Sequence, residues 1–283
     1  MQIRLIALDL DGTVFNDQKE ITPRTLEAIR AALQKGITVL PATGRTVTGV
    51  PKAFLEIPGV RYALTSNGAS VVDLQTGEKL VSLPFDMEQA ERAFDVLEDY
   101  GGMLSIFIDG ESYTTTANAQ DSLSMVPENL REYFRSTRNE VLDMHAMMEA
   151  HPREIEKFSI LYPTEAQRDA AWQAVAKACP QLEITSSIER NMELNAPGVT
   201  KGRALVALAE TLGYTRENVM ACGDSDNDLA MIRMAGLGVA MGNAQPEVLA
   251  AADAVTGDNN HDGVAQAIEK YILQGAGSGA ERY

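Results

Sequence analysis

The first third of the chain alternates short apolar runs with a stretch of helical periodicity. The runs Ile3–Leu8, Ile37–Ala42 and Tyr62–Thr65 lack strict alternation of apolar and polar residues, which is typical of buried strands in a parallel sheet. Between the first two runs, Thr22-Pro23 predicts the start of a helix and Lys35-Gly36 predicts its end. The order strand, helix, strand predicts an α/β fold.

Less regular elements surround the third run. A weaker helical pattern covers about Val47–Glu56 and is interrupted by Pro51, which cannot donate a backbone hydrogen bond. After Asn67-Gly68, two short apolar stretches lie on either side of the turn Gln75-Thr76-Gly77. This pattern predicts a β-hairpin before residue 84.

Residues 84–191 have a different pattern. The predicted elements are a helix over 87–97, a hairpin over 103–116, an irregular stretch over 117–139, strands over 155–162 and 182–188, and a helix between them over 165–178. A group of strands and helices that interrupts a parallel α/β pattern indicates a separate α+β domain.

The parallel pattern returns at Glu193. The predicted elements are a helix opened by Gly198–Gly202, a strand at 219–222, a helix through Met234, a strand at 237–240, a short helix after Pro246, a strand near 254–256 and a last helix through Ile272. The glycine-rich tail 275–279 is expected to be mobile. We therefore predict a discontinuous, Rossmann-like α/β core of residues 1–83 and 192–283, with residues 84–191 inserted as an α+β domain.

Three predicted strands end in polar clusters, and burying a core does not require this. The clusters are Asp9 with Asp11, Thr43 with Gly44, and Asp224 with Asn227 and Asp228. Ligands bind outside the carboxyl ends of the strands in open parallel sheets, so the clusters are expected to converge. The two aspartates either lie on one side of a continuing strand or surround a small volume opened at Gly12. In both arrangements the paired carboxylates need a cation or a shared proton, which indicates a metal site. The competing interpretation is an Asp-rich turn that ends a strand.

Composition and charge narrow the class of partner. The 283 residues include 24 Lys and Arg against 40 Asp and Glu, a net charge of -16, which argues against nucleic acid or an anionic membrane as the partner. No basic stretch followed by a long apolar segment starts the chain, and no run approaches membrane-spanning length. The two cysteines, Cys179 and Cys222, form no disulfide framework and fit a reducing compartment. We expect a cytoplasmic monomer or small homo-oligomer.

The polar clusters resemble the motifs of the haloacid dehalogenase (HAD) superfamily. Asp9-Leu10-Asp11-Gly12-Thr13 resembles the first motif, Ala42-Thr43-Gly44-Arg45 the second, Lys201 the third, and Gly223-Asp224-Ser225-Asp226-Asn227-Asp228 the fourth. The insertion between the second and third motifs resembles the cap domain of the Cof-type branch, subfamily IIB. The resemblance spans nearly the whole chain, and the first and fourth motifs are the most specific.

The resemblance implies a role for each motif residue. Asp9 is expected to be the nucleophile that forms an aspartyl-phosphate intermediate, and Asp11 the general acid/base. Mg²⁺ is expected on Asp9, the backbone carbonyl of Asp11 and Asp224, with Asp228 in support. The phosphoryl group is expected to contact Thr43, Lys201, Asn227 and backbone donors near Leu10 and Gly44.

These roles imply a magnesium-dependent phosphatase acting on a small phosphorylated metabolite. The alternatives are a phosphomutase with the same chemistry and an inactive phosphate-binding or regulatory protein. Substrate choice is expected to reside in the insertion, with hexose phosphates the leading guess. The insertion is rich in charged residues, and the sequence does not determine the orientation of their side chains. Among them are Asp109, Glu111, Arg131, Arg135 and His145.

Overall fold

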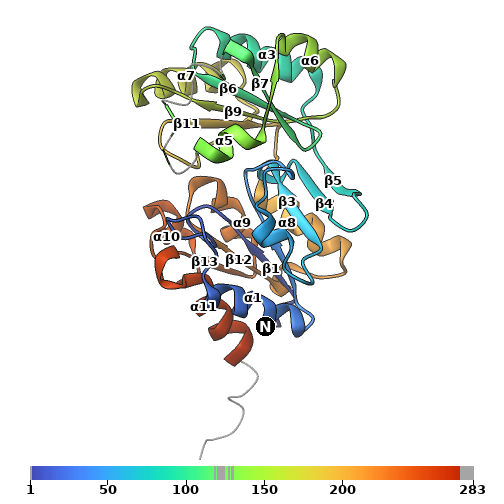
Figure 1. Ribbon diagram of the computed structural model, residues 1–283, viewed down its shortest axis with the longest axis vertical. Helices are drawn as coiled ribbons and strands as arrows, with labels where there is room; N and C mark the ends of the chain where they lie inside the picture. Colours follow the sequence, from blue (N-terminus) through green and yellow to red (C-terminus); the bar gives the residue numbers. More distant parts are fainter. Residues whose placement is uncertain (1, 118, 120–124, 127, 129–130, 275–283) are drawn as a thin grey trace, which may run out of the picture.

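The structure is a computed structural model that describes residues 2–117, 119, 125–126, 128 and 131–274. It has a lower and an upper part, joined by two crossings of the chain (Figure 1). The tail expected to be mobile, 275–279, lies outside the described residues.

The lower part is built on a parallel sheet of five strands. Its order is β14-β13-β12-β1-β2, and all neighbouring pairs are parallel. The strands are β1 (Leu5–Leu8), β2 (Thr38–Pro41), β12 (Val219–Gly223), β13 (Leu237–Ala240) and β14 (Ala254–Val255). Because β1 pairs with both β2 and β12, the residues that follow these three strands emerge side by side at one edge.

Helices cover both faces of this sheet. They are α1 (Pro23–Gln34), α8 (Lys201–Thr211), α9 (Leu229–Met234), α10 (Pro246–Ala251) and α11 (Gly263–Ile268), which continues as a π-helix over Glu269–Leu273. Ile6 and Leu8 of β1 belong to the same buried cluster as Ile29 of α1. Leu5 and Ala7 belong to a second cluster, with Leu205 of α8. Alternate residues of one strand therefore fill two hydrophobic layers, which confirms the predicted α/β core.

A small antiparallel sheet extends the lower part. It contains β3 (Tyr62–Thr65), β4 (Ser70–Asp73) and β5 (Lys79–Ser82). The sequence placed β3 in the run of parallel strands, and a parallel bridge between Ala42 and Leu64 does join it to the end of β2. Its longer pairing is antiparallel, with β4. The helix expected over 47–56 is reduced to α2 (Lys52–Leu55), which begins directly after Pro51.

The upper part is a mixed sheet of six strands. Its order is β10-β11-β9-β6-β7-β8, with only β7 and β8 paired in parallel among the described strands. The strands are β6 (Met103–Ile108), β7 (Glu111–Thr115), β8 (Arg138–Val141), β9 (Ile155–Leu161), β10 (Glu183–Thr185) and β11 (Asn191–Asn195).

The two faces of the upper sheet are covered differently. The helices α3 (Met87–Glu98), α6 (Met144–Ala150) and α7 (Glu165–Ala178) pack on the face turned away from the lower part (Figure 1). The short helix α5 (Arg131–Thr137) lies on the other side, between the sheet and the lower part. The fold is therefore α/β with an inserted mixed-sheet cap, as the resemblance implied.

Two expectations for the insertion need correction. The stretch 117–139, expected to be irregular, contains α5 and the start of β8, and α6 had not been expected. The parallel pattern does not return at Glu193, because β11 pairs antiparallel with β9 and β10 inside the upper sheet. The domain boundaries stay a prediction, but a division after Asn195 would leave that sheet intact, whereas one before Met192 cuts β11.

No helix in the described part of the chain is both long enough and apolar enough to cross a lipid bilayer.

Candidate active site

A buried lysine joins two of the predicted acidic clusters. The Asp9 N–H donates to the carbonyl of Cys222 at 3.0 Å, so the pairing of β1 with β12 holds Asp9 beside the fourth motif. Lys201, the first residue of α8, is fully buried. Its Nζ donates to Oδ1 of Asp9 and to Oδ1 of Asp228, both at 2.7 Å. The first, third and fourth motifs therefore meet at the ammonium group of Lys201.

Asp9, Asp224 and Asp228 form a compact carboxylate group. One oxygen from each lies within 4.8 Å of the others. Oδ2 of Asp228 also accepts from the N–H groups of Asp224 and Ser225, so Asp228 is held by its own loop. Burial, followed by the charge of Asp228, raises the pKa of Asp224 to about 7 and raises that of Asp9. Three carboxylates face one lysine, and this excess of buried oxygen ligands fits a hard divalent cation such as Mg²⁺.

Gly12 allows the first and fourth motifs to touch. Its φ is +84°, in the left-handed region that favours glycine. A Cβ at this position would lie 2.5 Å from Oδ2 of Asp224. Thr13, the next residue, donates from Oγ1 to the other oxygen of Asp224 at 3.0 Å. The turn after β1 therefore fixes the Asp224 carboxylate from two sides.

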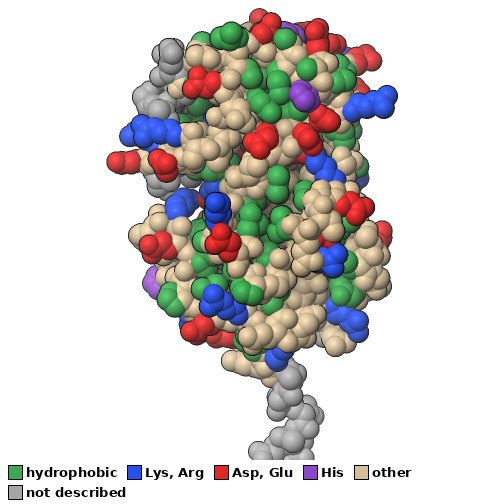
Figure 2. Space-filling view, turned by 45° about the vertical axis from the view of Figure 1, so that its right-hand side comes forward, with side chains coloured by type: hydrophobic (Ala, Val, Ile, Leu, Met, Phe, Trp, Pro, Cys, Tyr) green, Lys and Arg blue, Asp and Glu red, His purple; other side chains and the backbone are tan. Residues whose placement is uncertain are grey.

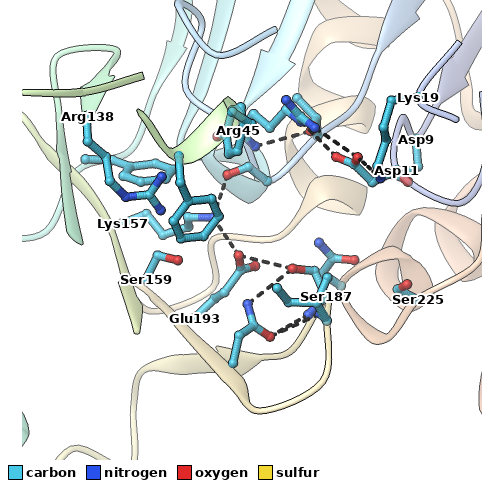
Figure 3. Close-up of a pocket in the computed structure, with 18 residues that line it drawn as sticks. Asp9, Asp11, Lys19, Arg45, Arg138, Lys157, Ser159, Ser187, Glu193 and Ser225 are labelled. Carbon is cyan, nitrogen blue, oxygen red and sulfur yellow. Dashed lines mark hydrogen bonds and ion pairs between the residues drawn. The ribbon is translucent and has the colours of Figure 1, made fainter. Parts of the chain in front are cut away.

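Asp11 has a different environment from Asp9. Its carboxylate accepts from Nε and Nη2 of Arg45 at 2.8 and 2.9 Å, and from Nζ of Lys19 at 2.8 Å. Burial alone would raise the pKa of Asp11, but Arg45 and Lys19 outweigh burial and hold that pKa well below its usual range. Asp9 and Asp11 line the same pocket with pKa values displaced in opposite directions (Figure 3). Without substrate, Asp11 is therefore held ionised, which opposes the general-acid role that the resemblance implies for it.

The residues expected to contact a phosphoryl group divide into two sets. Thr43, Gly44 and Asn227 line the pocket. Lys201 is absent from the pocket lining and contacts Asp9, and the side chain of Leu10 is buried in the core. Lys201 thus acts on Asp9 directly, and Leu10 has only its backbone to offer.

The pocket is closed from above by the cap. It has a cavity volume of about 100 Å³, which is below the usual range of small-molecule sites. Lys157 of β9 donates to the carbonyl of Gly44 and, at 2.9 Å, to Glu193 of β11. The Arg45 guanidinium lies 3.9 Å from the centre of the Tyr133 ring in α5. Cap residues therefore contact the strand-end loops directly.

Local charge at this pocket differs from that of the whole molecule. Acidic side chains are spread over the upper and lower parts in Figure 2, in line with the net charge of -16. The pocket lining, by contrast, holds four cationic side chains, Lys19, Arg45, Arg138 and Lys157, against the carboxylates of Asp9, Asp11 and Glu193. This small local excess of positive charge favours an anionic ligand.

Sequence reasoning missed several residues of the pocket. Arg45 stood inside the second motif but received no role, and Lys19 received none. The cap residues that line the pocket are Phe107, Tyr133, Phe134, Arg138, Lys157, Ser159, Ser187, Ile188, Asn191 and Glu193.

The charged residues singled out in the insertion lie outside the pocket. Asp109 forms an ion pair with Lys79, Glu111 accepts a hydrogen bond from Thr48, and His145 packs on Phe94. Arg131 and Arg135 also lie outside the described pocket lining.

Comparisons with known proteins identify a family model, sequence relatives and a solved structure that match this chain. A family model described as haloacid dehalogenase-like hydrolase matches residues 6–268. The chain is 34% identical to a 5-amino-6-(5-phospho-D-ribitylamino)uracil phosphatase of Bacillus subtilis, over 96% of this chain and 97% of that protein. It is 28% identical to a pyridoxal phosphate phosphatase of Escherichia coli, over 96% of this chain and 100% of that protein. The structure of a haloacid dehalogenase-like hydrolase from B. subtilis superposes with a TM-score of 0.84 at 29% identity, covering 96% of this chain and 100% of that one.

Proposed function

Because the chain belongs to the haloacid dehalogenase-like hydrolase family and is a phosphatase of small phosphorylated metabolites, we propose that it depends on Mg²⁺ and works through a phosphorylated Asp9. The observation that carries the proposal is the arrangement around Asp9. One of its oxygens is held by Lys201, while among the described residues no group donates a hydrogen bond to the other oxygen, Oδ2. Asp9 also lines the pocket, so a carboxylate oxygen is available to attack a phosphorus atom there.

In the proposed reaction Asp9 attacks the phosphorus atom and the bond to the leaving oxygen breaks. Asp11 gives its proton to that oxygen; it then takes a proton from the water that hydrolyses the aspartyl phosphate, which restores Asp9. The ion pairs of Asp11 with Arg45 and Lys19 oppose its protonation. We propose that the phosphoryl oxygens draw Arg45 and Lys19 away, so that Asp11 can hold a proton while substrate is bound.

The phosphoryl group is proposed to lie over the ends of β1 and β2. Thr43, Asn227 and the backbone of Leu10 and Gly44 would donate to its oxygens. Lys201 would keep Asp9 ionised and compensate charge on the phosphorylated side chain.

Mg²⁺ is proposed to bind Asp9 and Asp224, with Asp228 in support and the backbone carbonyl of Asp11 as a further ligand. The side chain of Asp11 is engaged by Arg45 and Lys19, which fits its assignment as a ligand through the backbone alone. When bound, the cation would neutralise negative charge on the phosphoryl oxygens.

The test of the proposed function is a screen of phosphorylated metabolites with and without metal. Dialysis against a chelator is expected to lower phosphate release to the background rate, and Mg²⁺ to restore it, because one lysine cannot compensate three carboxylates and a phosphate ester. Release of inorganic phosphate is the measurement. Undiminished activity after exhaustive chelation would contradict the proposed metal site.

A second prediction concerns the turn that supports Asp224. In Gly12→Ala the new Cβ meets the Asp224 carboxylate at 2.5 Å, so we expect kcat/KM to fall at least about tenfold through displacement of a proposed metal ligand. Gly36→Ala is the matched control: Gly36 has a similar φ of +78°, but no atom lies within 4 Å of its Cβ position. Both variants carry the backbone strain, and only Gly12→Ala should lose activity. An equal loss in both would remove the steric explanation.

A further inference from the structure

The cations that line the pocket differ in how their charge is compensated. Lys19 and Arg45 are paired with Asp11, and Lys157 is paired with Glu193. Arg138, the first residue of β8, has no carboxylate partner within the described residues. Its Nε donates to Oγ of Ser105 at 2.8 Å, and its buried Nη1 finds no acceptor among the described groups. Arg138 therefore enters the pocket as an uncompensated guanidinium.

This guanidinium stays charged under physiological conditions. Burial lowers the pKa of Arg138 to about 10, so the group remains protonated at neutral pH. A partly desolvated cation without a counter-charge or a full set of acceptors is costly. A ligand that brings an oxygen acceptor to Arg138 would recover part of this cost.

The ring of Phe134 fixes the orientation of Arg138. The centre of the guanidinium lies 3.4 Å from the centroid of that ring, which is a stacked cation–π arrangement. Tyr133 and Phe107 also line the pocket, so three aromatic side chains surround the space above the strand ends. Figure 3 shows Arg138 with Lys157 and Ser159 on one side of the pocket, and Asp9, Asp11 and Lys19 on the other. Arg138 is thus placed to meet the leaving group and not the phosphorus atom.

Apart from Asp9, the proposed nucleophile, the carboxylates of the pocket already accept hydrogen bonds from cationic side chains. Asp11 accepts from Arg45 and Lys19, and Glu193 accepts from Lys157 and Asn67. A sugar presents several hydroxyl groups, each of which needs an acceptor for its proton. The cap side of the pocket has the acceptor oxygens of Ser159, Ser187 and Asn191, and it adds the spare donor capacity of Arg138 and aromatic surface. These two features suit a flat ring bearing an oxygen that accepts hydrogen bonds.

We propose that Arg138 is a specificity-determining residue that binds an exocyclic oxygen on a flat heteroaromatic ring of the leaving group. This inference rests on the proposed phosphatase function and names its substrate class. Two relatives carry compatible names, since uracil and pyridoxal are both flat rings with exocyclic oxygens. The prediction of hexose phosphates is the competing outcome.

The test compares two esters in the full-length protein with Mg²⁺. Pyridoxine 5′-phosphate supplies the ring and its oxygen without an aldehyde that would react with lysines, and glucose 6-phosphate supplies the sugar. We expect the ring ester to have the higher kcat/KM. In Arg138→Met the ratio of the two kcat/KM values should fall roughly 10- to 100-fold, as for a lost hydrogen bond to a charged group. Most of the change should be in KM for the ring ester.

Two further variants control the measurement. Arg135→Met removes an exposed arginine from α5, three residues before Arg138, and should leave the ratio unchanged. Arg138→Lys keeps the charge without the planar fork, and should recover part of the preference. Preference for glucose 6-phosphate in the parent protein, or an unchanged ratio in Arg138→Met, would overturn the inference.

Failure of the proposed function has a separate signature. If the parent protein releases no phosphate from either ester or from 4-nitrophenyl phosphate, the proposed mechanism fails. Calorimetric binding of pyridoxine 5′-phosphate to the parent protein and to Arg138→Met then tests the inference alone. Weaker binding by the variant supports it, and equal binding or none to either protein overturns it.

Discussion

Replacing Asp9 with Asn is expected to lower kcat by at least about 10⁴-fold while the protein stays folded. An amide nitrogen or oxygen is a far weaker nucleophile than a carboxylate, and it is also a poorer ligand for Mg²⁺. The fold should survive because Asn has nearly the same shape and Lys201 keeps its second partner, Asp228, at 2.7 Å. Burial and Asp228 already raise the pKa of Asp9, so removing the Asp9 charge relieves repulsion within the carboxylate group.

The measurement is phosphate release together with acid-quenched labelling by a ³²P-labelled ester. Label should remain on the parent protein and be absent from Asp9→Asn, because an acyl phosphate survives acid. Asp99→Asn, at an exposed position that ends α3, is the matched control and should keep both labelling and turnover. Turnover by a folded Asp9→Asn variant within tenfold of the parent would show that Asp9 is not the nucleophile.

The parallel core could be predicted because its signals are local. The apolar runs at β1, β2, β12 and β13 each match an observed strand to within a few residues. Polar residues directly after such strands must emerge at the carboxyl edge of the sheet. The approach of Asp9, Asp224 and Asp228 also requires β1 and β12 to be neighbours, and the structure pairs these strands and brings the carboxylates together as expected.

The cap side of the pocket could not be predicted in the same way. Arg138 lines the pocket because β8 pairs with β7 in one particular register, in which Ser112 lies opposite Arg138, and a shift by one residue would turn the side chain to the other face. The helix that presents Tyr133 and Phe134 has only seven residues and no buried ones, so it gives no apolar stripe to detect.

The positions of two further pocket residues, Glu193 and Arg45, depend on tertiary contacts. Glu193 looked like the first residue of the returning core, yet β11 belongs to the cap sheet and places this carboxylate beside Lys157. Arg45 was visible within the second motif, but its bidentate contact with Asp11 and its stacking on Tyr133 join residues far apart in the chain. The spacing of residues along the sequence does not show which of them are in contact in the folded protein.

The second large effect is expected from Lys201→Met. The ammonium group is fully buried and lies 2.7 Å from both Asp9 and Asp228. Burial alone would lower the pKa of Lys201, but the two carboxylates outweigh burial and hold the pKa above its usual range. Methionine fills similar space without charge, so the variant leaves three neighbouring carboxylates without their buried cation. We expect the free energy of unfolding to fall by roughly 3 to 5 kcal/mol in the presence of a chelator, and kcat to fall about 10²- to 10³-fold with Mg²⁺.

The pH dependence of this loss separates lost charge from lost packing. Burial and Asp228 raise the folded-state pKa values of Asp9 and Asp224 above the unfolded value of about 3.9, and removing Lys201 should raise them further. Between the unfolded and folded pKa values the folded state binds more protons, so its stability falls as the pH rises. The loss of unfolding free energy in Lys201→Met, measured by denaturant unfolding in chelator, should therefore be larger at about pH 8 than at about pH 5.

Lys177→Met, at an exposed position in α7, is the control and should lower the free energy of unfolding by less than about 0.5 kcal/mol at either pH. A deficit of equal size at both pH values would mean that Lys201 stabilises the core by packing and not by compensating the carboxylates.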